Sequence, residues 1–456
     1  MAQKPRIPKG TRDFSPVEVS KRNFLFDVIK RNFEIFGFQP IETPSFELSE
    51  TLLGKYGEEG DRLIFKILNS GDFLKKVDDS VLESGQSNVI AQSISEKALR
   101  YDLTVPFARY VVQHQNDITF PFKRYQIQPV WRADRPQKGR FREFFQCDAD
   151  VVGSQSLWQE VEFVQLYDAV FADLNLNGAI IKINNRKVLY GIAEVIGAED
   201  KLLDFTIALD KLDKIGEENV KDELQAKGFE AAVLEKLQPL FNMSGSFTDQ
   251  LENLTSLLDS SSIGQEGIEE LKFINTSISE IGLRASQLEL DVTLARGLNY
   301  YTGTIYEVAP PQGVQMGSIG GGGRYDDLTG IFGLKNVSGI GISFGLDRIY
   351  LVMEELNLFP ESVTDSVEVL FINFGSEEAF YCLKLISQLR DQGISAELYP
   401  DAVKMNKQMT YANRREIPNV VLIGKDELQN NTLTLKNMKT GDQQKIKANQ
   451  LLTALK

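Results

Sequence analysis

The sequence predicts an α+β protein with a helical insertion and a small C-terminal α/β domain. Three observations support this fold class. Strand patterns with glycines fill 123–153 and 288–345, the stretch 203–282 is acidic, leucine-rich and helical, and 366–456 alternates strands with helices. The 456 residues allow about three domains. We expect one domain to be divided between 1–202 and 283–356, with the insertion at 203–282 and the last domain at 366–456.

The first elements follow from apolar spacing and prolines. Apolar residues recur at helical spacing over Pro16–Phe36, and Pro40 and Pro44 then impose an extended segment. An amphipathic helix is expected over 161–174 and a short strand over 178–184. In the last domain, the predicted strands are VEVLFINFG, ISAELYP and NVVLIG, with a helix between each pair.

Composition excludes several classes of protein. Lys and Arg total 50 against 64 Asp and Glu, so a chain that binds nucleic acid through bulk charge alone is excluded. Residues 366–456, with 12 basic and 10 acidic side chains, are the part least repelled by a polyanion. Two cysteines exclude a disulfide framework and a cysteine-rich zinc site, and favour the reducing cytoplasm. With no long apolar window and no signal-like start, we expect neither secretion nor a membrane span.

The chain has a single histidine, His114, at what reads as the exposed end of a helix. A surface or core role is therefore expected for it. Any chemistry should proceed without a histidine base.

The segment from Lys123 to Gly153 reads as a strand, a polar turn and a second strand. Seven basic residues and one acid lie between positions 123 and 142, which suggests an anionic ligand. Strand alternation places on one face Arg142, Phe144, Gln146, Asp148 and Asp150. Because these groups would make a costly core, two interpretations stay open: a ligand-binding wall and a solvated hairpin with ordinary salt bridges.

Four consecutive glycines at 320–323 remove the side chains from another predicted strand. They permit a ligand to approach the backbone, or they mark a bulge or tight strand crossing, which the glycines alone favour. Several tyrosines and arginines lie nearby in the sequence: Arg296, Tyr300, Tyr301, Arg324 and Tyr325. Tyrosine hydroxyls can bind a polar ring, and arginine guanidinium groups can bind phosphates.

Two further segments place polar groups beside apolar runs. In GIGISFGLDRIY, Arg348 falls in the first turn of a predicted helix. Two interpretations are open: Arg348 forms part of an anion site at the start of this helix, or it is a surface arginine. In YDLTVPF, Asp102 and Thr104 alternate with apolar residues along a predicted strand. Their carboxylate and hydroxyl groups would either hold an ammonium group of a ligand or form the polar outer face of the strand.

Taken in order, these segments resemble the class II aminoacyl-tRNA synthetases, and within them the histidyl-tRNA synthetase family. The resemblance covers nearly the whole chain, and the insertion least. It is carried by KGTRDFSP, IETPSFE (motif 1, with Pro44), VWRADRPQKGRFREFFQCDADVVG (motif 2), LARGLNYYTGTIYEV, SIGGGGRYDDL and GIGISFGLDRIY (motif 3). It implies an antiparallel catalytic sheet flanked by helices, a homodimer with motif 1 at its interface, and a C-terminal anticodon-binding domain.

The resemblance further implies an enzyme that attaches L-histidine to tRNA(His) through a histidyl-adenylate, using ATP and Mg²⁺ and releasing AMP and pyrophosphate. Adenine would lie between Phe144 and Arg348, and Arg132 would hold the α-phosphate and the amino-acid carboxylate. Arg132 and Arg296 would be the catalytic residues. The implied ATP-binding residues are Arg132, Asp134, Arg140, Phe144 and Arg348.

For the amino acid, the resemblance implies that Asp150 and Tyr301 read the ring nitrogens of histidine. The full implied set for L-histidine is Asp102, Thr104, Arg132, Gln146, Asp150, Arg296, Tyr300, Tyr301 and Tyr325. Since the substrate carboxylate is already ionised at neutral pH, its activation needs positioning and charge neutralisation rather than a general base. In the last domain, the resemblance implies phosphate contacts from Lys404, Lys407, Arg414 and Arg415, with a solvated helix face as the alternative for each.

The chain departs from the family pattern at three positions. Asn299 stands where the family most often has Asp, which removes a charge near Arg296. Asp102 and Asp150 stand where some relatives carry Glu, so the backbone must bring each shorter side chain to the ligand.

Two other functions compete with this one. A non-catalytic paralogue would bind histidine and regulate histidine biosynthesis, but such paralogues tend to lose the ATP-binding arginines and the C-terminal domain that this chain keeps. A class II synthetase for another amino acid is opposed by the two histidine-type segments.

Overall fold

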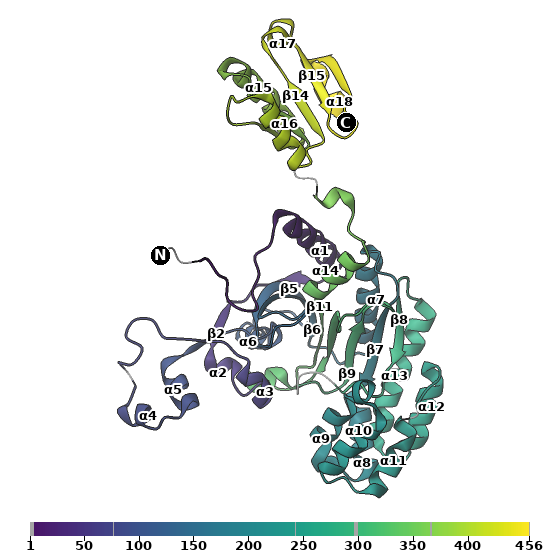
Figure 1. Cartoon of the computed structure of the whole chain (residues 1–456). Helices are drawn as coiled ribbons and strands as arrows, with labels where there is room; N and C mark the ends of the chain where they lie inside the picture. Colours follow the sequence, from purple (N-terminus) through teal and green to yellow (C-terminus); the bar gives the residue numbers. More distant parts are fainter. Residues whose placement is uncertain (1–3, 76, 242, 296–299, 365–366, 456) are drawn as a thin grey trace. The chain divides into compact units, whose positions relative to one another are not determined.

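The computed structural model describes residues 4–75, 77–241, 243–295, 300–364 and 367–455. The chain forms two compact units, Met1–Phe359 and Pro360–Lys456 (Figure 1). The expected boundaries near 202 and 282 both fall inside the first unit, and they stay predictions.

An eight-stranded sheet forms the centre of the first unit. In spatial order its strands are β1 (Gln39–Pro40), β5 (Phe122–Trp131), β6 (Glu143–Val152), β11 (Gly339–Gly345), β10 (Gly320–Tyr325), β9 (Thr304–Ala309), β7 (Ala179–Asn185) and β8 (Ser286–Leu290). Neighbouring strands are antiparallel except for the outer pairs β1–β5 and β7–β8, which are parallel. The predicted antiparallel sheet is confirmed.

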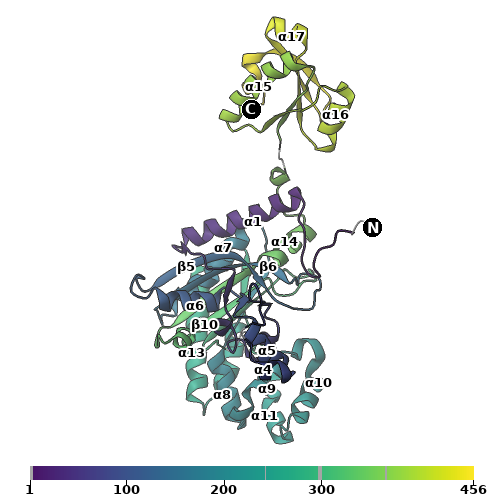
Figure 2. The same cartoon turned by 90° about the vertical axis from the view of Figure 1, so that its left-hand side faces the viewer.

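Helices cover one face of this sheet and bury its apolar side chains. They are α1 (Pro16–Ile35), α7 (Trp158–Asp173) and α14 (Leu346–Glu355), seen together in Figure 2. A capping box at Ser15 and Glu18 fixes the start of α1. Along β6, Cys147, Ala149 and Val151 point into this core. Helix α7 was expected to be amphipathic, but most of its side chains are buried because it is covered by other helices as well as by the sheet.

The other face of the sheet is polar where β5, β6 and β11 run side by side. Arg124 on β5 pairs in register with Asp150 on β6, Gln126 with Asp148, and Gln128 with Gln146. On the far side of β6, the same three positions face Gly341, Ser343 and Gly345 of β11. The strand alternation inferred from the sequence therefore holds over 144–150, and it directs these polar groups away from the apolar core.

A bundle of helices lies beside β7 and β8 (Figure 1). Its members are α8 (Arg186–Ile196), α9 (Leu202–Leu209), α10 (Leu212–Ala226), α11 (Ala231–Phe241), α12 (Phe247–Leu257) and α13 (Ser262–Ile281). Helices α8 and α13 touch at Gly191 and Gly264, where a Cβ on Gly191 would come within 2.6 Å of the Gly264 Cα. The bundle shares one apolar core with the sheet, so the inserted helices extend the first unit.

A small lobe carries the segment resembling motif 1. Its three strands are β2 (Phe46–Leu48), β4 (Lys97–Leu99) and β3 (Lys66–Ile67), and its helices are α2 (Ser49–Leu52), α3 (Gly57–Arg62), α4 (Asp79–Glu83) and α5 (Ser87–Ile94). The chain leaves this lobe through α6 (Thr104–Gln113). The expectation of a strand through Asp102 and Thr104 is wrong: the Asp102 carboxylate accepts a hydrogen bond from the Val105 amide (3.2 Å), and so supports a helix start.

The second unit has a five-stranded sheet with apolar residues packed on both faces. Its strand order is β13 (Ala396–Leu398), β12 (Val369–Phe371), β14 (Asn419–Leu422), β15 (Thr432–Asn437) and β16 (Gln443–Lys447). The helices are α15 (Ser376–Asp391), α16 (Met405–Arg414), α17 (Lys425–Asn430) and α18 (Leu451–Leu455). The predicted alternation of strands and helices is confirmed as far as β14, while the β15–β16 hairpin that follows was not predicted. Among the helices described in either unit, none is both long and apolar enough to cross a membrane.

Candidate active site

Two adjoining cavities open on the polar face of the large sheet. The larger has a volume of about 290 Å³ and the smaller about 120 Å³. They share four lining residues, Arg132, Gln146, Gly321 and Ser343. A ligand in one cavity can therefore meet a ligand in the other beside the Arg132 guanidinium.

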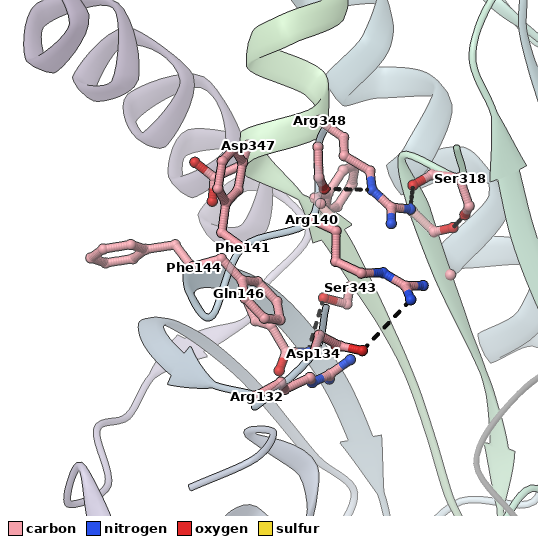
Figure 3. Close-up of a pocket in the computed structure, with 16 residues that line it drawn as sticks. Arg132, Asp134, Arg140, Phe141, Phe144, Gln146, Ser318, Ser343, Asp347 and Arg348 are labelled. Atoms are coloured by element: carbon pink, nitrogen blue, oxygen red, sulfur yellow. Dashed lines mark hydrogen bonds and ion pairs between the residues drawn. The ribbon is translucent and has the colours of Figure 1, made fainter. Parts of the chain in front are cut away.

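The larger cavity combines an aromatic ring with several cationic groups (Figure 3). Arg348 is fixed by hydrogen bonds from its Nε to the Gly139 carbonyl (3.0 Å) and from its Nη1 to the Ser318 carbonyl (2.6 Å). Gly139 has φ +71°, and a Cβ there would come within 3.2 Å of the Arg348 Cγ. Phe144 presents its ring to the same cavity. Such a site suits a flat, polyanionic ligand.

Arg132 lies where the two cavities meet. Its Nε donates to the Tyr101 carbonyl (3.0 Å), and its Cζ lies 4.3 Å from the Tyr101 ring centroid and 5.2 Å from that of Phe144. These contacts fix the plane of the guanidinium. Across the larger cavity, Asp134 and Arg140 form a partly exposed ion pair with 3.6 Å between Oδ1 and Nη1.

The smaller cavity is lined by three aspartates and three tyrosines. The Tyr325 hydroxyl donates to Asp150 (2.6 Å), whose other oxygen lies 2.8 Å from Nη2 of Arg124, a fully buried guanidinium. Asp102 accepts a hydrogen bond from the Tyr56 hydroxyl (2.7 Å). One oxygen of Asp102 has no hydrogen-bond partner among the described residues, so it is an acceptor available to a ligand.

Burial controls the charge of this smaller cavity. It raises the pKa of Asp148 to about 7; Arg124 opposes the rise, and the carboxylates of Asp150 and Asp102 add to it. Burial also raises the pKa values of Asp102 and Asp150. A cationic ligand group entering the cavity would favour the ionised form of each carboxylate. The cavity is thus suited to a small molecule that carries positive charge and several N–H donors.

Every described residue of the implied substrate sets lines one of the two cavities. The larger contains Arg132, Asp134, Arg140, Phe144, Gln146 and Arg348. The smaller contains Asp102, Thr104, Arg132, Gln146, Asp150, Tyr300, Tyr301 and Tyr325. Arg296 and Asn299 lie outside the described residues. The glycines at 320–322 line the cavities too, which favours the ligand-approach interpretation of the glycine run.

Two residues singled out by sequence have other surroundings. Arg324 was considered for phosphate binding, but it is buried against Glu160, with its Nε 2.5 Å from Oε1 and its Nη2 2.7 Å from Oε2. The phosphate-binding prediction rested on the proximity of Arg324 to the glycines in the sequence, but the Arg324 side chain lies on the other side of its strand. His114 ends α6, packs on the Tyr110 ring and lines neither cavity, as expected.

The substrate-binding sets implied by the sequence left out four residues of this site: Arg124, Asp148, Ser343 and Tyr56. Strand alternation had placed Asp148 on the correct face, and the same alternation along β5 would have found Arg124. Ser343 lies opposite Asp148 in the β6–β11 register. Tyr56 comes from the separate lobe, and no local pattern signals its approach to Asp102.

Comparison with known proteins agrees with this architecture. A family model described as histidyl-tRNA synthetase matches residues 79–349, more than half of the chain, and one described as an anticodon-binding domain matches residues 367–456. The histidine–tRNA ligase of Christiangramia forsetii is 69% identical over 456 residues, covering 100% of both chains. That of Flavobacterium johnsoniae is 64% identical over 461 aligned positions, with 97% of each chain covered. The crystal structure of histidyl-tRNA synthetase from Nostoc sp. PCC 7120 matches with a TM-score of 0.82 and 32% identity, covering 100% of this chain and 99% of that one.

Proposed function

Because this chain belongs to the histidyl-tRNA synthetase family and is a histidine–tRNA ligase of class II, we propose that its larger cavity binds ATP and its smaller cavity L-histidine. The observation that carries this assignment is the shared wall of the two cavities at Arg132 and Gln146. The bond to be formed joins the histidine carboxylate to the α-phosphorus, so the two ligands must meet at one point.

In the larger cavity, the adenine lies against Phe144 with the Arg348 guanidinium on its other side, and Arg140 faces the phosphates. Aromatic and guanidinium planes both stack on nucleobases. The larger cavity would also take Mg²⁺ held mainly by phosphates, because such an ion uses only one or two protein carboxylates, and Asp134, which lines this cavity, would be one of them. When bound, the ion would lower the negative charge of the phosphates.

In the smaller cavity, the polar groups match the donors and acceptors of histidine. Asp150, fixed by Tyr325 and Arg124, accepts from a ring nitrogen, and Tyr301 completes the ring site. Asp102, with its unpartnered oxygen, holds the substrate ammonium together with Asp148, while Thr104 and Tyr300 border the same site. An amino acid without two ring nitrogens would leave these buried groups unpaired, which is a strong basis for rejection.

Activation begins with an ionised carboxylate that attacks the α-phosphorus in line, and pyrophosphate leaves. The chain's contribution is orientation and charge neutralisation: Arg132 bridges the carboxylate and the α-phosphate at the junction of the cavities. We assign Arg296 to the same phosphate from sequence alone. No histidine is needed, in agreement with the position of His114 away from both cavities.

The second unit would bind the tRNA anticodon. Lys404, Lys407 and Arg414 lie exposed along or beside α16, whereas Arg415 is engaged by Glu397 and the Tyr411 hydroxyl. We therefore assign phosphate contact to the first three before Arg415.

A homodimer in the cytoplasm is the proposed assembly. Phe46, in the motif 1 segment, and Leu48, just after it, lie on the edge strand β2 and are about half exposed, as an apolar interface would require. Sedimentation velocity tests this assembly: a chain that remains monomeric at micromolar concentration contradicts it.

The regulatory paralogue is not supported, since full-length relatives are histidine–tRNA ligases and the three implied ATP-binding arginines, Arg132, Arg140 and Arg348, line the larger cavity. The decisive assay is amino-acid-dependent exchange of pyrophosphate into ATP, run with each of the twenty amino acids. We expect exchange with histidine alone. If active protein gives no exchange with histidine, or gives exchange with another amino acid, the proposed function is contradicted.

A further inference from the structure

The segment from Pro8 to Phe14, called here the N-terminal segment, packs against the loop at 132–142, called the β5–β6 loop. The Arg142 amide donates to the Gly10 carbonyl (2.8 Å). Gly10 has φ +87°, and a Cβ there would come within 2.8 Å of the Arg142 Cγ and 3.0 Å of the Pro136 Cγ. The two segments thus fit closely only because position 10 lacks a side chain.

Arg12 links this segment to two walls of the larger cavity. Its Nη2 donates to Oδ1 of Asp347 (2.6 Å), and its Cζ lies 3.3 Å from the centroid of the Phe141 ring. Asp347 and Phe141 both line the larger cavity, although they come from α14 and from the β5–β6 loop (Figure 3). Arg12 does not line the cavity itself.

Asp347 is held at the position just before Arg348. It is only 5% exposed, and a carboxylate that buried requires charged partners. Arg12 supplies one partner and Arg22, from α1, the other. Because Asp347 and Arg348 are adjacent in the first turn of α14, fixing one fixes the backbone that carries the other.

We propose that Arg12 is a positioning residue for ATP: by joining Phe141 to Asp347, it holds the β5–β6 loop against the start of α14 and so sets the width of the nucleotide cavity. This inference rests on the proposed binding of ATP in the larger cavity. The flat guanidinium is suited to the task, since it stacks on the Phe141 ring with its face while its edge donates to the carboxylate.

Kinetics of histidine-dependent pyrophosphate exchange test the proposal. For Arg12→Ala we expect the KM for ATP to rise about tenfold, with the KM for histidine unchanged. The free energy of a partly buried cation–π contact, such as that of Arg12 with the Phe141 ring, corresponds to roughly this factor. Arg12→Lys keeps the charge but loses the planar stack, so an intermediate KM is expected. Arg6→Ala, an exposed residue of the same terminal region, is the matched control and should leave both constants unchanged.

A second variant approaches the same contact from the other side. Gly10→Ala forces the N-terminal segment away from Arg142 and Pro136, and it should raise the KM for ATP in the same direction as Arg12→Ala. Thermal melts of each variant show whether the fold is intact.

The proposal is overturned if Arg12→Ala retains the KM for ATP of the unaltered enzyme. It is equally overturned if kcat and the melting temperature fall while that KM is unchanged, because this pattern indicates a purely structural role. Should the unaltered chain show no exchange at all, the proposed function fails, and titration with a fluorescent ATP analogue then decides the role of Arg12 separately: weaker binding by Arg12→Ala supports it, and equal binding refutes it.

Discussion

Replacing Asp148 with Asn tests the charge of the smaller cavity. The Asp148 carboxyl is 2% exposed, and its pKa of about 7 means that it is mostly protonated at pH 6 and mostly ionised at pH 8. The sign follows: the ionised form, which attracts the substrate ammonium, gains population as pH rises through 7. Between pH 6 and pH 8 the ionised fraction changes about tenfold, and so should the part of histidine affinity that depends on Asp148.

Isothermal titration of histidine into both proteins, at pH 6, 7 and 8, measures this effect. At pH 8 we expect Asp148→Asn to weaken binding by about 2 kcal/mol, a factor of roughly 30, the typical worth of a hydrogen bond to a charged group. At pH 6 the factor by which the substitution weakens binding should be about tenfold smaller, roughly 3, because the Asp148 carboxyl of the unaltered enzyme is then largely neutral, like the Asn side chain that replaces it.

The ratio of the two dissociation constants removes the titration of the free histidine ring, which affects both proteins equally. A ratio that is the same at pH 6 and pH 8 would show that ionisation of Asp148 does not contribute to histidine binding. Gln126→Glu, which adds a carboxylate directly across from Asp148 in the β5–β6 register, should raise the pKa of Asp148 and move the transition to higher pH.

Three further predictions concern other parts of the site. Phe144→Ala should raise the KM for ATP about tenfold or more through loss of base stacking, with the KM for histidine unchanged in exchange kinetics; an unchanged KM for ATP would place the adenine elsewhere. Tyr325→Phe removes the hydrogen bond to Asp150 and should raise the KM for histidine by about one order of magnitude at constant KM for ATP, whereas equal changes in both would contradict a ring-reading role. Arg324→Met leaves Glu160 buried without its ion-pair partner and should lower the free energy of unfolding in urea by about 3 kcal/mol; normal stability with a weakened affinity for ATP would instead restore a phosphate role.

Local sequence patterns predicted most of this site because it is built on strands. Alternation along β6 was enough to place Gln146, Asp148 and Asp150 on one face, since the side-chain period of a strand is two whatever its surroundings. The glycines of β10 and the position of Arg348 in the first turn of α14 followed from equally local signals.

The errors came where tertiary contacts decide. Asp102 and Thr104 read as a strand, yet the Asp102 side chain supports the start of α6, and its second oxygen has no hydrogen-bond partner among the described residues. Arg324 resembled a phosphate ligand by its neighbours in sequence, and only the packing of Glu160 against its strand shows otherwise. The partnership of Arg12 with Asp347 spans 335 positions and has no local signature.

The most direct test of the two-cavity account is a crystal structure with a non-hydrolysable histidyl-adenylate analogue. We expect adenine between Phe144 and Arg348, the imidazole beside Asp150 and Tyr325, and the linkage between them within hydrogen-bond reach of Arg132. An analogue bound with its imidazole in the larger cavity, or with the linkage remote from Arg132, would contradict it.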